Sequence, residues 1–397
     1  MKSEAASNGH ALVVSYSDIV SDPRVRRQID WLSEAGWSVD SLGLSSVTPP
    51  RVRDHFPIGD PSRWLVTGVG TAIAHRLLPA RVRFRRLLLD RVPNELRDRI
   101  RSGRYELIVF NEFEFLPWVA DTRDFTPAAR NAQLHLDIHE YRNPVHRRPT
   151  LGGRITANHY RWMRSFIGNP AFDTRTVVNA PIGALYQEEF GFDEPVVVRN
   201  TPGYVDQAPS SIRPDEIRLL FHGMPGRARG FDQILDAMRV LPDRFTMTFM
   251  LMPNAEVRRW LDEQLAAHPA RSRINIVPPA PMREISQRIN PYDLEIIFYR
   301  PLGRNLEFAL PNKFFEAIQG RLGLVVGESP LMAEIVRRYG NGVVVPGFEA
   351  EDLVESLRNL TPERVMEFKR ASGTAARELN AEVEGRRFIS ALEGGRT

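Results

Sequence analysis

The sequence predicts an α/β protein of two doubly wound parallel-sheet domains that face each other across a cleft. Strand-like and helix-like segments alternate through both halves of the chain, which is typical of parallel sheets covered by helices. Strand candidates such as residues 107–110 are continuously apolar, as expected for strands buried on both faces. Residues 200–214 are rich in turn formers and make the best candidate linker between the halves.

The first half shows one helix with recognisable ends and a series of strands. Asp22 can cap a helix that has Pro23 at its first position and that ends at Gly36. We assign residues 1–200 to an N-terminal domain with strands at residues 11–16, 39–44, 64–67, 107–110, 134–138, 176–178 and 195–198.

The alternation restarts after the linker with cleaner spacing and predicts a second doubly wound domain over residues 201–375. In such domains ligands bind at the carboxyl ends of the strands. Residues 376–397 are expected to form a C-terminal helix that packs back on the first domain. The expected strands are residues 217–221, 245–252, 274–277, 294–299, 322–326 and 343–345, and the expected helices are residues 231–240, 255–267, 282–289, 311–319, 332–338 and 350–360.

Composition narrows the class of protein. The chain has 397 residues and 42% hydrophobic content, enough for two or three domains of roughly 100–200 residues each. It contains no cysteine, which excludes disulfides, thiolate metal sites and a cysteine nucleophile. No run approaches the roughly 18 apolar residues of a membrane span, and the polar first ten residues contain no apolar signal region. We therefore expect a cytoplasmic protein.

Residues 75–104 are the most basic part of the chain, with ten arginines and three acidic residues. Pro93 divides the segment into two helices. A basic amphipathic helix can lie on an anionic membrane, and the segment is our candidate for peripheral membrane contact. In the alternative, the apolar stripe docks on a sheet while the arginines stay solvated. The segment lacks interleaved exposed aromatic residues, so nucleic-acid binding is not expected. The stripe consists of Phe84, Leu88, Val92, Leu96 and Ile100.

The most informative segment is residues 311–320, which begin a helix soon after a buried strand. Lysine occurs only at positions 2, 313 and 369 of this arginine-rich chain, so Lys313 suggests that a compact point charge is needed. A helix N-terminus with an ammonium group forms an anion site, and the carboxylate of Glu316 can accept hydrogen bonds from sugar hydroxyls. A surface ion pair has the same spacing, but the combination favours a nucleotide-sugar site.

The turn at residues 222–230 has the composition of a second phosphate-binding element. Its glycines at 223, 226 and 230 let the backbone approach a ligand closely, and Arg227 and Arg229 precede a helix that starts at Phe231. A diphosphate leaving group needs fixed positive charge and backbone donors. The alternative is an ordinary turn between a strand and a helix.

Several motifs follow one another in a particular order: residues 22–28, 36–39, 137–140, 197–202, 227–237, 311–316 and 340–343. Their order and spacing resemble the GT-B glycosyltransferases, which have two Rossmann-like domains, and specifically the large retaining family 4 (glycosyltransferase group 1). The resemblance covers nearly the whole chain and is strongest over residues 217–346. It implies a metal-independent enzyme that moves a sugar from a nucleotide-diphosphate sugar to a glycan, glycolipid or small-molecule acceptor, as in bacterial polysaccharide biosynthesis.

The resemblance also implies roles for individual residues. Glu316 would hold the ribose, Arg229 and Lys313 the diphosphate, and His139 would face the donor sugar. The first domain would bind the acceptor near residues 16–27, and the position of Arg24 and Arg27 there suggests that they meet an anionic acceptor. No metal is expected, because Arg229 and Lys313 can neutralise the diphosphate and because four of the histidines lack zinc-site spacing, namely His75, His135, His146 and His159. The catalytic candidates are thus His139, Arg229 and Lys313, and the donor-binding candidates are Gly223, Arg227, Arg229, Leu310, Asn312, Lys313 and Glu316.

The sequence departs from the family pattern at one position that matters for the sugar. The first of the family's two glutamates falls at position 308, which is Phe308, and Glu307 lies one place away. Two alternatives therefore stay open. One is a nucleotide-sugar 2-epimerase that uses Glu112, Glu114 and Glu140 as acid and base around C2 of the sugar. The other is a catalytically degenerate GT-B partner subunit.

Overall fold

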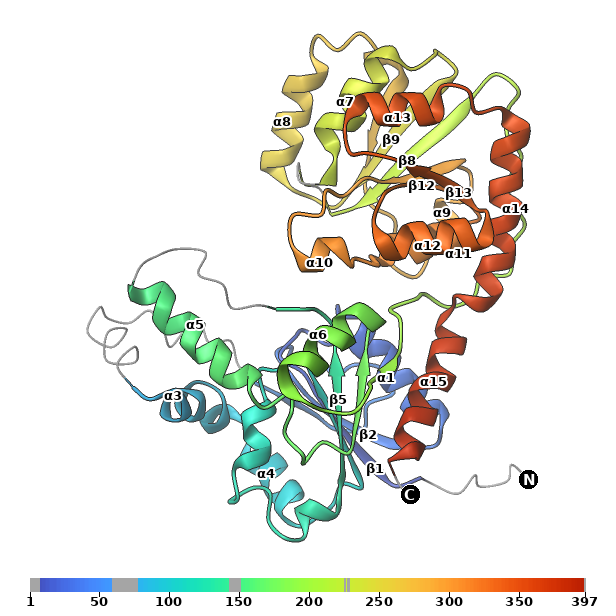
Figure 1. The fold of residues 1–397 in the computed structure, drawn as a ribbon. Helices are drawn as coiled ribbons and strands as arrows, with labels where there is room; N and C mark the ends of the chain where they lie inside the picture. The colour runs from blue at the N-terminus through green and yellow to red at the C-terminus, as the bar shows by residue number, and fades with distance from the viewer. Residues whose placement is uncertain (1–7, 59–77, 143–150, 225, 227–228, 396–397) are drawn as a thin grey trace, which may run out of the picture. The chain divides into compact units, whose positions relative to one another are not determined.

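The computed structural model describes residues 8–58, 78–142, 151–224, 226 and 229–395 (Figure 1). They form two compact units. The first contains the residues up to Arg199 together with those from Gly385 onward, and the second contains Asn200–Glu384. Each unit holds one parallel β-sheet flanked by helices, in agreement with the predicted fold class.

Seven strands among the described residues of the first unit form a sheet in the order β3-β2-β1-β4-β5-β6-β7. The chain runs outward from β1 to one edge and then from β4 to the other, which is the doubly wound order, and every strand pair is parallel. The strands are β1 His10–Val14, β2 Ser38–Gly43, β3 His55–Pro57, β4 Leu107–Asn111, β5 Gln133–Ile138, β6 Thr174–Val177 and β7 Val196–Val197.

The first helix begins and ends where its caps predict. Oδ1 of Asp22 accepts hydrogen bonds from the backbone N–H groups of Arg24 and Val25 at 3.1 and 3.2 Å, and Gly36 follows the helix with φ of 87°. The helices of the first unit are α1 Pro23–Glu34, α3 Ala80–Leu87, η2 Leu89–Arg91, α4 Asn94–Arg101, η3 Leu116–Ala120, η4 Ala129–Asn131, α5 Leu151–Arg164 and α6 Ala180–Phe190.

Helices α3 and α4 confirm that Pro93 divides the basic segment. Its apolar stripe is buried, since Phe84, Leu88, Val92, Leu96 and Ile100 are at most 8% exposed. The stripe therefore docks on the protein and is not available to enter a membrane. No helix in the described ranges is long and apolar enough to span one.

Some arginines of this segment are not solvated, in contrast to the alternative drawn from the sequence. The guanidinium of Arg97 is buried against Asp124 at 2.9 Å. Arg101 lies 2.8 Å from the same carboxylate, and Arg99 bridges Asp40 and Asp54 at 2.9 and 2.6 Å. These carboxylates lie far from the segment in sequence, so the charge excess of residues 75–104 is partly neutralised by folding.

The described part of the second unit has a six-stranded parallel sheet in the order β10-β9-β8-β11-β12-β13. The chain again moves outward from the middle to each edge in turn. The strands are β8 Ile217–Gly223, β9 Phe245–Leu251, β10 Ile274–Val277, β11 Leu294–Ile297, β12 Gly323–Gly327 and β13 Gly342–Val345. The helices are α7 Phe231–Val240, α8 Ala255–Leu265, η6 Arg271–Arg273, α9 Ile285–Arg288, α10 Arg304–Glu307, α11 Asn312–Gln319, α12 Pro330–Tyr339, α13 Ala350–Leu357 and α14 Pro362–Glu378.

The C-terminal region differs from the single helix expected from residue 376. Helix α14 starts at Pro362, where the hydroxyl of Thr361 accepts a hydrogen bond from the N–H of Arg364 at 3.3 Å. Asn380 then starts a new helix, because its Oδ1 accepts from the N–H of Val383 at 2.9 Å. This helix, α15, spans Ala381–Gly394 and enters the first unit at Gly385.

Two strands of the first unit call for comment, one that was expected and one that was not. The strand expected at residues 64–67 lies outside the described residues. Strand β3 was not predicted, because three residues that end in Pro57 are too few to show a strand period.

At Gly230, the start of α7 packs closely against the residue that follows β11, and a substitution there tests this packing. Its φ is +85°, and a Cβ built there would lie 2.5 Å from the carbonyl oxygen of Phe298. We expect Gly230→Ala to lower the free energy of unfolding by about 3 kcal/mol, from left-handed strain and overlap together. The matched control is Gly340→Ala, whose φ is +64° with no atom within 4 Å of its Cβ, and it should cost about 1 kcal/mol. Urea unfolding measures both, and equal losses would contradict the packing argument.

Candidate active site

Strand β8 delivers the first component of the site to the carboxyl edge of the second sheet. Its last residue, Gly223, has φ of +105°, a conformation that side chains rarely adopt. A Cβ added there would lie 3.6 Å from Cε of Lys313, which is an ordinary contact. The backbone angle rather than lack of space therefore favours glycine, and the turn places the backbone beside the lysine.

Lys313 lies in the first turn of α11, and its side chain is buried. Its Nζ is 3.3 Å from the centre of the Phe221 ring and has no hydrogen-bond partner among the described residues. Burial lowers the pKa of Lys313 to about 7, although Glu295 and Glu316 act in the opposite direction. The sequence-predicted point charge is thus present as an amine that is only partly protonated at neutral pH.

Arg229 and Lys313 lie beside the same aromatic ring, that of Tyr299. Its guanidinium is 5.4 Å from the centre of the Tyr299 ring, and Nζ of Lys313 is 5.7 Å from the same centre. Arg229 also donates a hydrogen bond of 3.2 Å to the Tyr299 hydroxyl. The structure therefore brings two of the predicted diphosphate ligands together, whereas Arg227 lies outside the described residues.

Glu316, the predicted ribose ligand, belongs to a buried chain of charges. Its Oε2 lies 3.0 Å from Nε2 of His222, and Nδ1 of His222 lies 3.0 Å from Oε2 of Glu295. Burial opposes the charge on the imidazole, but the two carboxylates outweigh it and raise the pKa of His222 to about 9. An imidazolium thus holds Glu316 on one side and Glu295 on the other.

The start of α11 differs slightly from the prediction. Pro311 is the N-terminal cap rather than the first helical residue, and no side chain among the described residues caps the helix there. The N–H of Phe314 donates to the carbonyl oxygen of Pro311 at 2.9 Å, so the N–H groups of Asn312 and Lys313 are the ones available to an acceptor. Oδ1 of Asn312 accepts a hydrogen bond of 2.7 Å from Asn200, and Leu310 packs against the core. These two residues fix the helix start.

Position 308, where the sequence resemblance would place a glutamate, lies at the end of α10. Phe308 caps this short helix, and the carboxylate of Glu307 forms an ion pair of 3.1 Å with Arg304. Glu307 is therefore engaged within its own helix.

In the first unit, Asp137 is the centre of a buried polar cluster at the end of β5. Its carboxylate accepts hydrogen bonds from Nε and Nη2 of Arg24 at 2.6 and 2.5 Å, from Thr176 at 2.6 Å, and from Gln28. Nε2 of His139 lies 2.8 Å from it, so the two side chains share one face, as the spacing predicts. Burial opposes the charge on Asp137, but Arg24 and His139 hold its pKa well below the usual range.

Arg24 is not available to an anionic acceptor, in contrast to the expectation from its position. It is 3% exposed, its guanidinium is bidentate to Asp137, and Nη1 donates to the carbonyl oxygen of Val198 at 2.8 Å. The physical reason is the buried carboxylate, which would be unpaired without it.

Carboxylates also surround the other side of His139. Glu112 follows β4 with φ of 61°, and its Oε1 accepts a hydrogen bond of 2.9 Å from the backbone N–H of His139. Burial raises the pKa of Glu112 to about 7, despite nearby His139 and Arg142. Arg142 lies 3.8, 3.1 and 3.5 Å from the carboxylates of Glu112, Glu114 and Glu140. A non-glycine residue held in this backbone region often marks a functional site.

Sequence reasoning missed His222 and Glu295. The available signal was a glutamate inside the apolar strand at residues 294–298, since a buried carboxylate requires a partner. The identity of that partner depends on the pairing of β8 with β11, which no local pattern contains.

Two domains that each contain a doubly wound parallel sheet are typical of the GT-B fold, and solved structures of this class match nearly the whole chain. One is sucrose-phosphate synthase from Thermosynechococcus elongatus, with a TM-score of 0.67, 14% identity, and coverage of 97% of this chain and 98% of that one. The lipopolysaccharide outer core galactosyltransferase WaaB matches with a TM-score of 0.66 and 9% identity, over 97% of this chain and 99% of that one. Anabaena HepE, solved in complex with UDP-glucose, matches with a TM-score of 0.63 and 12% identity, over 97% of this chain and 100% of that one. The chain therefore has the GT-B fold.

No protein-family model matches the sequence, and no curated protein matches it either.

The charge chain at His222 predicts a particular dependence of stability on pH. The pKa of His222 in the folded protein, about 9, exceeds the ordinary value of 6.5. The stability that the charged imidazole contributes is therefore complete below pH 6.5 and is lost as pH rises through 9. We expect the unfolding free energy of the wild type to exceed that of His222→Gln by an amount that shrinks by about 3 kcal/mol between pH 6 and 10.

His268 supplies the control within the same unit, because burial lowers its pKa. The advantage of the wild type over His268→Gln should shrink as pH falls below 6.5 instead. Urea unfolding at a series of pH values measures both differences. A difference for His222→Gln that does not change with pH would contradict the charged imidazole.

Proposed function

We propose that the protein is a retaining glycosyltransferase of the family 4 type, which transfers a sugar from a nucleotide-diphosphate sugar to an acceptor. The cluster of Lys313, Arg229 and Glu316 beside Gly223 carries this proposal. Its two cations suit a diphosphate, and its carboxylate suits the hydroxyls of a ribose. The cluster lies at the carboxyl edge of a doubly wound sheet, where such ligands bind in this architecture.

The proposed reaction relies on charge stabilisation. The bond between the anomeric carbon and the diphosphate oxygen breaks, and the acceptor oxygen bonds to that carbon on the same face. The acceptor proton passes to the leaving phosphate oxygen. Negative charge grows on the diphosphate, where Arg229, Lys313 and the N-terminus of α11 oppose it. The positive charge on these groups is available without a metal ion.

Glu316 is well held for the proposed ribose contact. Among the described residues only its Oε2 has a hydrogen-bond partner, His222, which leaves Oε1 to accept from a ribose hydroxyl. Glu295 fixes the imidazole from behind at 3.0 Å. His222 is therefore proposed as a positioning residue for Glu316.

His139 is proposed to face the donor sugar, and the first unit to bind the acceptor. Burial opposes protonation of His139, but Asp137 and Glu112 outweigh it and raise its pKa. Nε2 of His139 faces Asp137 and Asn111 at 2.8 and 3.0 Å, so Nδ1 is the nitrogen proposed to donate a hydrogen bond to a sugar hydroxyl.

A nucleotide-sugar 2-epimerase is the second candidate, because the structure brings its three candidate carboxylates together. Glu112, Glu114 and Glu140 all lie within 4 Å of Arg142. The pKa of about 7 at Glu112 suits an acid or base near neutral pH.

Nucleotide binding tests the proposed donor site. Since a ligand at about 100 times its dissociation constant adds roughly 2.7 kcal/mol of stability, UDP should raise the melting temperature of the wild type. We expect Glu316→Ala to abolish the shift, and Glu355→Ala, which removes an exposed carboxylate from α13 of the same unit, to retain it. The absence of a shift with UDP, GDP, dTDP and ADP alike would contradict the proposal.

The fate of the donor separates the three candidate functions. A transferase should slowly hydrolyse its nucleotide sugar in D₂O to a sugar of unchanged anomeric configuration. Deuterium at C2 of the sugar would identify an epimerase instead. Nucleotide binding without turnover of any donor would identify the degenerate subunit.

The buried amine of Lys313 predicts proton uptake on binding. At pH 8 it is mostly neutral in the free protein, given a pKa of about 7, and a bound diphosphate favours the ammonium form. UDP binding should therefore take up about one proton. Calorimetry in Tris and in phosphate should give apparent enthalpies that differ accordingly. Lys313→Arg, which is always charged, should remove the difference, and equal wild-type enthalpies in both buffers would disprove this role.

A further inference from the structure

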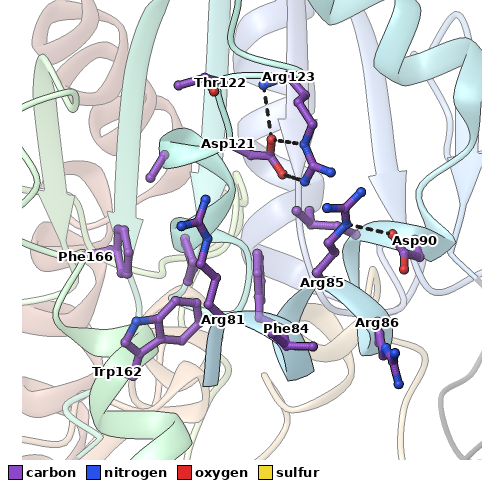
Figure 2. Close-up of a pocket in the computed structure, with 14 residues that line it drawn as sticks. Arg81, Phe84, Arg85, Arg86, Asp90, Asp121, Thr122, Arg123, Trp162 and Phe166 are labelled. Carbon is purple, nitrogen blue, oxygen red and sulfur yellow. Dashed lines mark hydrogen bonds and ion pairs between the residues drawn. The ribbon is translucent and has the colours of Figure 1, made fainter. Parts of the chain in front are cut away.

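A pocket of about 1000 Å³ in the first unit belongs to neither polar cluster described above (Figure 2). It is lined by α3 and η2, by residues 117–123 that follow β4, and by the end of α5. It shares no lining residue with the clusters around Asp137 and Lys313. The pocket is therefore a separate feature of the surface.

Positive charge predominates in this pocket. Four arginines face two aspartates. Arg123 is paired with Asp121, and Arg85 lies 3.5 Å from Asp90 in an exposed pair, which is worth little in water. Arg81 and Arg86 are exposed and have no carboxylate partner within the described ranges. In Figure 2 the guanidinium of Arg81 lies between the aromatic rings and Asp121, whereas that of Arg86 points away from them. One free guanidinium group therefore faces the pocket, and a second lies at its rim.

The pocket also has a fixed aromatic wall. The ring of Trp162 is partly exposed and packs at centroid distances of 5.7 Å from Phe84 and 5.4 Å from Phe166. In Figure 2 the rings of Trp162 and Phe84 lie opposite Asp121, Thr122 and Arg123, and the ring of Phe166 lies at one side between them. Any ligand that enters therefore meets a flat apolar surface on one side and polar groups on the other.

A membrane surface as such does not explain this arrangement. The apolar stripe of α3 and α4 is buried, as shown by Phe84 at 2% and Leu96 at 0% exposure, so no apolar face of these helices can enter a bilayer. The free arginines instead border a concave space of the size that holds a small molecule.

We propose that this pocket binds a sugar ring that carries a phosphate or carboxylate group. The planar fork of Arg81 matches such a group in a bidentate manner, and Arg86 adds positive charge at the rim of the pocket. His159 stacks on one face of Trp162 at a ring-centre distance of 5.9 Å, and the other face offers apolar area to the C–H face of a pyranose ring. The hydroxyl of Thr122 and the carboxylate of Asp121, which lie across the pocket from Trp162 (Figure 2), can bond the ring hydroxyls.

This second site goes beyond the proposed transfer reaction, and two sources can supply its ligand. One is a free acidic sugar or an acidic residue of a glycan. The other is the headgroup of a lipid such as phosphatidylinositol, which joins a polyol ring to a phosphate.

Titration calorimetry with free ligands tests the site. Glucose 6-phosphate and glucuronate should bind at least tenfold more tightly than glucose and inorganic phosphate. The double variant Arg81→Ala with Arg86→Ala should weaken glucose 6-phosphate binding at least tenfold. Arg104→Ala is the matched control, because Arg104 is exposed in the same basic segment but lies outside the pocket, and it should bind like the wild type.

Sedimentation with vesicles separates the two sources. If the ligand is a lipid headgroup, the wild type should sediment with phosphatidylcholine vesicles that contain phosphatidylinositol, and the double variant should not. A free ligand is indicated if only the soluble sugars bind. Equal binding to phosphatidylglycerol vesicles by the wild type and all variants would show general electrostatic attraction and overturn the proposal.

Three further results would overturn the proposal. They are inorganic phosphate binding as tightly as glucose 6-phosphate, an equal loss in Arg104→Ala, and uridine monophosphate binding more tightly than glucose 6-phosphate in a manner lost in the double variant. Circular dichroism and the retained response to UDP show whether the double variant is folded, so failure here is distinguishable from failure of the proposed donor site.

Discussion

The ion pair between Arg24 and Asp137 is the constraint on which the first unit depends. Asp137 is fully buried, and a carboxylate in such a place is stable only when it is paired and hydrogen-bonded. Its partners come from α1, β6 and the residue after β5, and Arg24 also bonds the chain just beyond β7. One charge thus fixes the relative positions of a helix and three strands at the carboxyl edge of the sheet, and it holds His139 there in a defined orientation.

In the second unit too, a buried carboxylate is paired with a positively charged side chain, but the residues differ. Glu295 is fully buried in the middle of its sheet and is compensated by His222, which in turn holds Glu316. Lys313, next to this chain, has no hydrogen-bond partner among the described residues and is stabilised by an aromatic ring. This buried charge lies beside a glycine turn, where a ligand can reach it. A second buried ion pair of the unit, between Lys369 and Asp293 at 3.3 Å, joins α14 to the residue before β11.

Periodicity and caps predicted the fold well, because strands buried on both faces and helices with Asp22 or Gly36 at their ends carry their own local signals. The Lys313 and Glu316 pair was visible for the same reason, since both lie on one short helix. The partners of those residues were not predictable. His222 meets Glu316 across 94 residues, and Arg24 meets Asp137 across 113. Such contacts depend on strand order and register. Arg24 was expected to meet an anionic acceptor because no local pattern shows that Asp137 is its buried partner.

Helix α15 has a consequence for how the protein is made. Its Phe388 packs against Trp31 and His135 at ring-centre distances of 5.6 and 5.3 Å, and the carbonyl oxygen of Leu392 accepts a hydrogen bond of 2.6 Å from Gln133. These contacts lie within the first unit, yet the ribosome produces them only after all of the second unit. The part of the chain that is synthesised first is therefore the part that completes its core last, and a nascent chain without α15 exposes Trp31 and His135 to water and to chaperones.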